Sequence, residues 1–280
     1  MEVSRASSAG AWLAEAEAFL RDREAESSLP LGLAMAARDS AGGGAATTGW
    51  TARDAGRIVG CALLPTSSVL VLSRATDEAT DALAQAVADA ADAHITGAVG
   101  PERSAERFAV RFANGRGASW RRHWTLILHE LGELAQPAAI AGRSRRATPG
   151  DAEVVARWLE AFSRDTGALV QPHDPRALAE RVIEAGRAYL HEDGGAPVAL
   201  AGWSRPTGRT CSINMVYTPD EFRRRGYARA LTTHVARELT ARGTQHILLF
   251  TNEAEPGPNA LYPSLGFAPF ARFLEVVFEP

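Results

Sequence analysis

The sequence has 280 residues, of which 46% are hydrophobic and 22% charged, as expected of a globular protein long enough for two domains. Its formal net charge of −3 gives no general attraction for nucleic acid, so any anion site must be local. All 30 basic residues are arginines, which excludes a lysine Schiff base and a Walker-type phosphate loop. The abundant alanine, glycine and arginine are typical of GC-rich bacterial genomes.

The sequence argues against a membrane protein and against a metal-binding protein. No stretch approaches the roughly 18 apolar residues of a membrane span, and the first residues lack the basic start and long apolar run of a signal peptide. We therefore expect a cytoplasmic protein that does not bind membranes. Cys61 and Cys211 lie far apart in apolar runs, without a CxxC spacing, which favours two core thiols and no metal site.

In the first half, residues 1–40 are expected to be helical because Trp12, Leu13, Ala16 and Leu20 recur at helical spacing. The elements expected after them are two or three strands over 50–73, a helix over 76–94 with Thr76 as N-cap, a strand over 95–101, a helix over 102–117 that ends at glycine, and a strand over 119–131.

In the second half, a stretch rich in alanine, glycine and proline predicts a domain boundary. We expect domains over 1–135 and 143–280 with a linker over 136–142. The elements expected in the second domain are a strand from 143, helices over 150–165 and 175–186, strands over 187–193, 197–206 and 210–219, a helix over 226–242, a strand over 245–252, a short helix over 257–266 and a terminal strand or strand pair. Both halves show a similar element order, which predicts a mixed α/β unit used twice.

The most informative stretch is VYTPDEFRRRGYARAL, residues 216–231. Three consecutive arginines precede Gly226 at a predicted turn from strand to helix. A helix start leaves backbone N–H groups without partners and carries partial positive charge, so it is a ready anion site. Glycine has no Cβ to hold an anion away from the backbone. The stretch therefore predicts a diphosphate site, and the absence of Gly-x-Gly-x-x-Gly argues against a dinucleotide fold.

The spacing Arg-x-x-Gly-x-Ala, from Arg223 to Ala228, resembles the acyl-CoA pyrophosphate loop of the GNAT N-acetyltransferase superfamily. NALYPSLGF, residues 259–267, resembles that family's Asn-x-x-Tyr-x-x-x-Gly-Phe segment. The resemblance covers 143–280 by motif and the first half by element order. It implies an α/β (mixed α+β) fold of two GNAT-like domains. Each would be a mostly antiparallel twisted sheet with a central splayed parallel strand pair, flanked by helices.

The resemblance also implies acetyl-CoA as co-substrate, without a metal, and a set of site residues. The pantetheine arm would pair with Met215, Val216, Tyr217 and Thr218, and the Val216 N–H would polarise the thioester carbonyl. Tyr262 would be the acid for the leaving thiolate. The remaining residues expected to bind the cofactor are Arg223, Arg224, Arg225, Gly226, Tyr227, Ala228, Arg229, Asn252 and Asn259.

This sequence departs from the family's pattern at the general base, because the predicted strand before the arginines has no acidic residue. The nearest candidates are His191, Glu192 and Asp193, for which a solvated turn is the preferred interpretation. Asp165 and His173 are candidates for the acceptor pocket or simply loop residues.

The first half lacks the arginine and glycine loop. Asp77, Glu78 and Asp81 stand at the matching helix start, where carboxylates would repel a diphosphate, so we expect no CoA binding there. Arg121 and Arg122 either touch a substrate or alternate on an ordinary strand.

We expect an enzyme, monomeric or homodimeric, that transfers an acetyl group to a small-molecule amine by direct attack in a ternary complex, without nucleic acid as a partner. The acceptor's identity stays open. The alternatives are a non-catalytic acyl-CoA-binding or sensing protein on the same fold, and a partner-binding protein without a ligand, against which the arginine loop argues.

Overall fold

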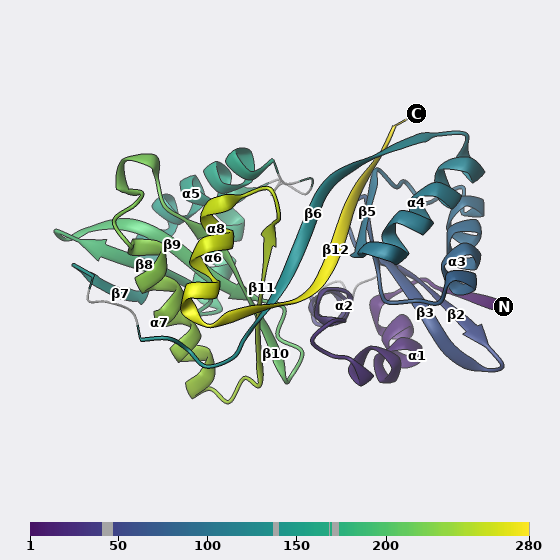
Figure 1. The fold of residues 1–280 in the computed structure, drawn as a ribbon, viewed down its shortest axis with the longest axis horizontal. Helices are drawn as coiled ribbons and strands as arrows, with labels where there is room; N and C mark the ends of the chain where they lie inside the picture. The colour runs from purple at the N-terminus through teal and green to yellow at the C-terminus, as the bar shows by residue number, and fades with distance from the viewer. Residues whose placement is uncertain (41–46, 137–139, 168, 170–173, 280) are drawn as a thin grey trace. The chain divides into compact units, whose positions relative to one another are not determined.

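The computed structural model describes residues 1–40, 47–136, 140–167, 169 and 174–279 (Figure 1). The chain divides into two compact units. Unit 1 comprises Met1–Leu128, Phe250–Pro256 and Phe270–Pro280, and unit 2 comprises His129–Leu249 and Gly257–Pro269. The units therefore differ from two consecutive blocks of sequence, because two segments of the second half belong to unit 1.

Unit 1 is a sheet with helices on both faces. Its strands follow the order β1-β2-β3-β4-β5-β12-β6. The elements are β1 (Glu2–Ala6), α1 (Ala9–Asp22), α2 (Ser28–Arg38), β2 (Thr48–Asp54), β3 (Arg57–Leu64), β4 (Val69–Leu72), α3 (Asp77–Asp89), β5 (Gly97–Pro101), α4 (Glu102–Arg116), β6 (Ser119–Leu131) and β12 (Phe267–Glu279). Leu83 of α3 and Phe108 of α4 share a buried cluster with Leu274 of β12, while Trp12 and Leu31 pack with Cys61 in a second cluster.

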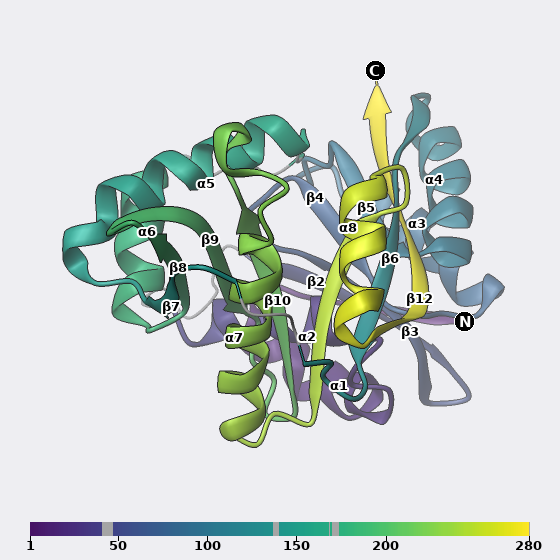
Figure 2. The same cartoon turned by 60° about the vertical axis from the view of Figure 1, so that its left-hand side comes forward.

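Unit 2 repeats this layered plan, and its strands follow the order β11-β10-β9-β8-β7. The elements are β7 (Arg143–Arg146), α5 (Ala152–Thr166), α6 (Pro175–Glu184), β8 (Ala188–Asp193), β9 (Ala196–Ser204), β10 (Thr210–Tyr217), α7 (Tyr227–Ala241), β11 (His246–Asn252) and α8 (Pro256–Leu261). Helix α7 packs in one buried cluster and α5 with α6 in another, on opposite sides of the sheet (Figure 2).

Each unit has one parallel strand pair within mainly antiparallel pairings. In unit 1, β4 pairs in parallel with β5, from Val69 opposite Gly97 to Val71 opposite Val99. In unit 2, β10 pairs in parallel with β11, from Thr210 opposite His246 to Ser212 opposite Leu248. The predicted fold class of two GNAT-like domains is thereby confirmed.

Most predicted elements are present, with one difference. The strand β1 lies within the stretch expected to be helical, because polar residues such as Glu2 and Ser4 pair with the edge of β2. The terminal stretch, expected to be a strand or a strand pair, forms a single strand, β12, whose Phe273 to Val277 pair with β5. Leu274 and Val276 are fully buried there, so apolar burial draws this strand into unit 1.

Cys61 and Cys211 are free, buried thiols, as expected. Within the described part of the chain, no helix combines the length and apolar character needed to cross a bilayer. The same residues contain no cluster of histidine, cysteine and carboxylate side chains suited to a metal ion.

Candidate acyl-coenzyme A site

A β-bulge interrupts strand β10 at the position where the sequence predicts the thioester. Asn214 pairs with Gly202 of β9, and Tyr217 pairs with Leu200. Met215 and Val216 therefore oppose the single residue between these partners, which leaves their backbone groups outside the regular ladder. Met215 has φ 54°, a left-handed conformation that is unfavourable for a residue with a Cβ. Such strain in the middle of a strand is typical of functional sites.

The bulge also changes which face of the sheet the side chains occupy. Before it, Cys211 and Ile213 pack in the cluster of α7. After it, Met215 and Tyr217 pack against the cluster of α5 and α6. A regular strand would keep alternate residues on one face, so the extra residue has redirected the end of β10.

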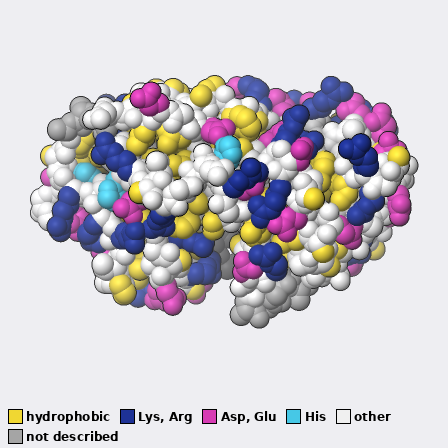
Figure 3. All heavy atoms as spheres, turned by 90° about the horizontal axis from the view of Figure 1, so that it is seen from below, with side chains coloured by type: hydrophobic (Ala, Val, Ile, Leu, Met, Phe, Trp, Pro, Cys, Tyr) yellow, Lys and Arg dark blue, Asp and Glu magenta, His cyan; other side chains and the backbone are white. Residues whose placement is uncertain are grey.

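The arginine loop follows β10 and leads into α7. Arg223 shapes the loop, because its Nε donates to the Thr218 carbonyl at 3.0 Å and its Nη1 pairs with Asp220 at 2.8 Å. Arg224 and Arg225 are exposed, and Arg224 makes no ion pair or hydrogen bond with any described residue. Arginine side chains gather on the face of unit 2 seen in the left half of Figure 3.

Helix α7 begins without a side-chain cap. Gly226 is its N-cap, and the first backbone bond of the helix runs from the Ala230 N–H to the Gly226 carbonyl at 3.0 Å. The N–H groups of Tyr227, Ala228 and Arg229 precede that bond and so have no partner in the helix. These N–H groups lie where the sequence predicts a diphosphate site.

The structure shows a further reason for glycine at position 226. Its φ is 86°, and a Cβ there would stand 2.6 Å from Cδ1 of Ile140. Ile140 belongs to the predicted linker, so nothing in the local sequence indicated this contact. A substitution of Gly226 would therefore strain the fold as well as any anion site.

Tyr227 and the acidic residues of β8 are occupied by structural contacts. The hydroxyl of the buried Tyr227 donates to Asp193. His191 is buried, with Nδ1 2.9 Å from Ser144 Oγ and Nε2 2.8 Å from the Ala141 carbonyl. Glu192 pairs with two arginines of β7. None of these three candidates is an unoccupied base.

Tyr262 lies between α8 and the 3₁₀ turn Pro263–Leu265, where its backbone carbonyl accepts from the Phe267 N–H at 3.1 Å. Its ring packs in the same buried cluster as Val216 and Tyr227. Burial raises the pKa of the Tyr262 hydroxyl. Among the described residues this hydroxyl has no hydrogen-bond partner.

The other predicted residues are placed as follows. Asn259 is half-buried in α8. Asn252 ends β11 within unit 1, where its side-chain oxygen accepts from the Ala254 N–H at 3.1 Å. Asp165 ends α5 and accepts from the Tyr217 hydroxyl at 3.2 Å, a contact missed by sequence reasoning because it joins distant elements. His173 lies outside the described residues.

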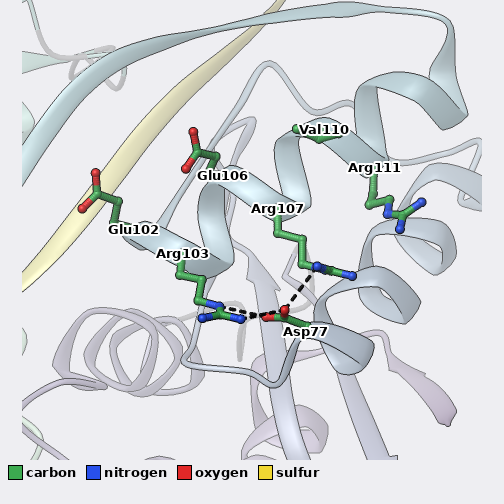
Figure 4. Close-up of a pocket in the computed structure, with 7 residues that line it drawn as sticks. All are labelled: Asp77, Glu102, Arg103, Glu106, Arg107, Val110 and Arg111. Carbon is green, nitrogen blue, oxygen red and sulfur yellow. Dashed lines mark hydrogen bonds and ion pairs between the residues drawn. The ribbon is translucent and has the colours of Figure 1, made fainter.

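The matching helix start in unit 1 is closed. Thr76 caps α3 by accepting from the Ala79 N–H at 3.2 Å, as predicted. Arg103 and Arg107 of α4 pair with Asp77 at 2.8 and 3.2 Å (Figure 4). Arg107 also pairs with Asp81 at 2.7 Å. These hydrogen bonds to arginine lower the pKa values of both carboxyl groups.

An open groove of about 610 Å³ borders this network in unit 1. Its lining residues are Asp77, Glu102, Arg103, Glu106, Arg107, Val110 and Arg111. Arg122 pairs with two of the glutamates, Glu102 and Glu106, and Arg121 pairs with Glu279. The charged side chains that line this groove are thus paired with one another, with Asp81 of α3 or with Arg122 of β6, whereas Arg224 before α7 has no such partner among the described residues.

One protein family matches most of the second half of the chain. The family model described as "Acetyltransferase (GNAT) family" matches residues 155–267. No curated protein matches the sequence closely enough to count as a relative.

Several solved structures share the fold. A GNAT-family acetyltransferase from Colwellia psychrerythraea has a TM-score of 0.59 at 13% identity, covering 100% of this chain and 99% of the other. A tandem GNAT protein from the clavulanic acid biosynthesis pathway has a TM-score of 0.58 at 17% identity, covering 99% and 98%. A GCN5-related N-acetyltransferase from Sphaerobacter thermophilus has a TM-score of 0.61 at 17% identity, covering 84% and 81%.

At these identities the structural likeness concerns the fold, and it extends over the whole chain for the first two proteins. The matched stretch contains β10 with its bulge, the arginine loop and the start of α7. Residues 155–267 are therefore similar to the GNAT acetyltransferase family.

Proposed function

We propose that residues 143–280 bind acetyl-CoA and transfer its acetyl group to the amine of a small molecule, by direct attack in a ternary complex. The observation that carries this proposal is the sequence of features in unit 2: a bulged strand, an arginine loop and an uncapped helix start. Together they offer donors for a thioester carbonyl and for a diphosphate along one short stretch of chain.

The residues present fit the diphosphate of coenzyme A. Arg224 and Arg225 carry exposed guanidinium groups, and the first-turn N–H groups of α7 add backbone donors. Arg223 holds the loop in shape, and Ala228 keeps the first turn of α7 small. The Thr218 Oγ1 is buried and has no hydrogen-bond partner among the residues that the structure describes, so it is a candidate donor for an amide of the pantetheine arm.

When bound, acetyl-CoA supplies an acyl group already activated as a thioester. The Val216 N–H lies outside the β9 ladder, so it can bond the thioester oxygen as negative charge develops there. Tyr262 keeps its proton across the working pH range because burial raises its pKa. Its hydroxyl can therefore donate to the leaving sulfur.

No carboxylate in β10 can take the proton of the attacking amine, and Glu192 and Asp193 are engaged in other bonds. We propose that the amine loses its proton to water. Unit 1 would support the active unit without binding CoA itself, because the start of α3 is capped and its carboxylates are paired.

Thiol release from acetyl-CoA with a panel of small amines tests this function. We expect amine-dependent release that falls at least about 100-fold in Tyr262→Phe, within the range for loss of a general acid. Tyr189→Phe is the matched control, because Tyr189 is a buried tyrosine of the same unit outside the loop. Equal rates in wild type and Tyr262→Phe would remove the acid role.

Calorimetric titration with CoA separates the two functional classes. Binding together with thiol release supports the enzyme. Binding without release for any amine would instead favour an acyl-CoA-sensing protein, and the absence of binding would refute the site itself.

A further inference from the structure

We infer that Met215 sets the length of the acyl chain that this site accepts, an inference that rests on the proposed function. The juxtaposition that carries it is the Met215 side chain laid over Gly202, beside the strand position assigned to the thioester. Shortening this side chain should admit longer acyl groups.

Met215 is held in place by its own packing. Its left-handed backbone is unfavourable, so a compensating contact must hold it there. Any Cβ at position 202 would overlap Met215 Cε, which shows that the thioether fills the space left by the missing side chain of Gly202. Gly202 pairs with Asn214 directly before the bulge, so the space that Met215 fills lies next to the bulge.

The two faces of the sheet differ in their packing at the bulge. On the α7 face, Val216 packs against a cluster that includes the fully buried Leu231 and Val235. On the opposite face stand the half-buried side chains of Met215 and Tyr217. A group attached to a carbonyl at the Val216 N–H therefore extends toward Met215 and Tyr217.

Of the side chains on that face, Met215 is the adaptable one. The Tyr217 hydroxyl donates a hydrogen bond to Asp165 at 3.2 Å, and the centroid of the Tyr217 ring lies 6.4 Å from the centroid of the buried Trp158 ring. Methionine is unbranched with several rotatable bonds, and Met215 Cε lies over the backbone of Gly202, where no side chain holds it. Truncating Met215 would open a cavity that reaches the sheet, whereas an acetyl group needs no such space.

The test compares acetyl-CoA with butyryl-CoA in wild type, Met215→Ala and Met215→Leu. Hydrophobic pockets discriminate by about 10- to 200-fold for each methylene. We expect the butyryl-to-acetyl ratio of kcat/KM to rise at least about 10-fold in Met215→Ala. Met215→Leu keeps the volume and should leave the ratio within about threefold of wild type.

Met215→Gly is a second variant with the same expected gain, because glycine accepts φ 54° without strain and offsets the lost packing. If Met215→Ala and Met215→Gly both fold and bind acetyl-CoA but keep the wild-type ratio, the inference is overturned.

Binding measurements distinguish this failure from failure of the proposed function. Calorimetric titrations with acetyl-CoA and butyryl-CoA report the same preference without turnover, and we expect the relative affinity for butyryl-CoA to rise in Met215→Ala. Unchanged relative affinities would sink the role of Met215 alone. A wild-type protein that binds neither acyl-CoA would sink the proposed function and this inference together.

Discussion

Replacing Arg224 by asparagine should change protein stability and coenzyme affinity in opposite directions. Arg224 is exposed, has φ 63° and contacts no described residue through an ion pair or hydrogen bond. A left-handed conformation costs a residue with a Cβ about 1–2 kcal/mol, and asparagine tolerates it better than arginine. The free protein should therefore be as stable as wild type or gain up to about 1 kcal/mol.

The affinity for coenzyme A should fall, because the substitution removes the positive charge proposed to face the diphosphate. A hydrogen bond to a charged group contributes about 1.5–3 kcal/mol, and every 1.4 kcal/mol changes the dissociation constant about tenfold. We therefore expect CoA to bind about 10- to 150-fold more weakly. The difference should shrink in 1 M salt, where the Debye length falls to about 3 Å.

The assay combines urea unfolding of the free protein with calorimetric titration of CoA. Arg237→Asn is the matched control, because it removes the same charge from an exposed position on α7. Arg237 lies ten residues after Tyr227, about 15 Å along the helix. This substitution should leave the affinity within about twofold. Equal losses in both variants would show that only net charge matters, and no loss in Arg224→Asn would refute the assigned loop.

Three further outcomes are expected. Ala228→Glu should weaken CoA binding about 100-fold by charge repulsion, while its interaction with the helix dipole should raise the free energy of unfolding by about 0.5 kcal/mol. If Ala228→Gln weakens CoA binding equally, the size of the side chain and not its charge is responsible. Burial raises the pKa of Glu275 to about 7, so the folded state holds an extra proton between pH 4.5 and 7 and stability falls as pH rises through that window. Glu275→Gln should therefore add up to about 3 kcal/mol to the free energy of unfolding at pH 8 and little at pH 4, whereas the exposed control Glu279→Gln should change little at either pH. Deleting Phe270–Pro280 should expose α3 and α4 of unit 1 to hydrogen exchange, because Leu274 and Val276 are buried in their cluster; undiminished protection would contradict this role of β12.

Much of the fold could be predicted because it depends on local patterns. Thr76 was recognisable as the cap of α3 from the acidic first turn that follows it, and the cap hydrogen bond is present. Gly117 ends α4 in a left-handed conformation, as a glycine after a helical pattern predicts. The strand β6 has the predicted bounds, Ser119–Leu131.

Other features depend on contacts between residues far apart in the sequence. The bulge at Met215 needs the bare backbone of Gly202 on another strand. The Tyr227 hydroxyl donates to Asp193 of β8, more than 30 positions earlier, a contact that the motif did not indicate. The glycine at 226 also makes room for Ile140, 86 positions earlier.

By itself, the sequence determined the run of helices and strands and the short arginine loop that marks the family, because periodicity, caps and motif spacing act over a few residues. Only the tertiary structure decided which unit takes the last strand, which arginines stay unpaired and which face the end of β10 presents. Those outcomes depend on burial and ion pairing between distant segments, which no local pattern encodes.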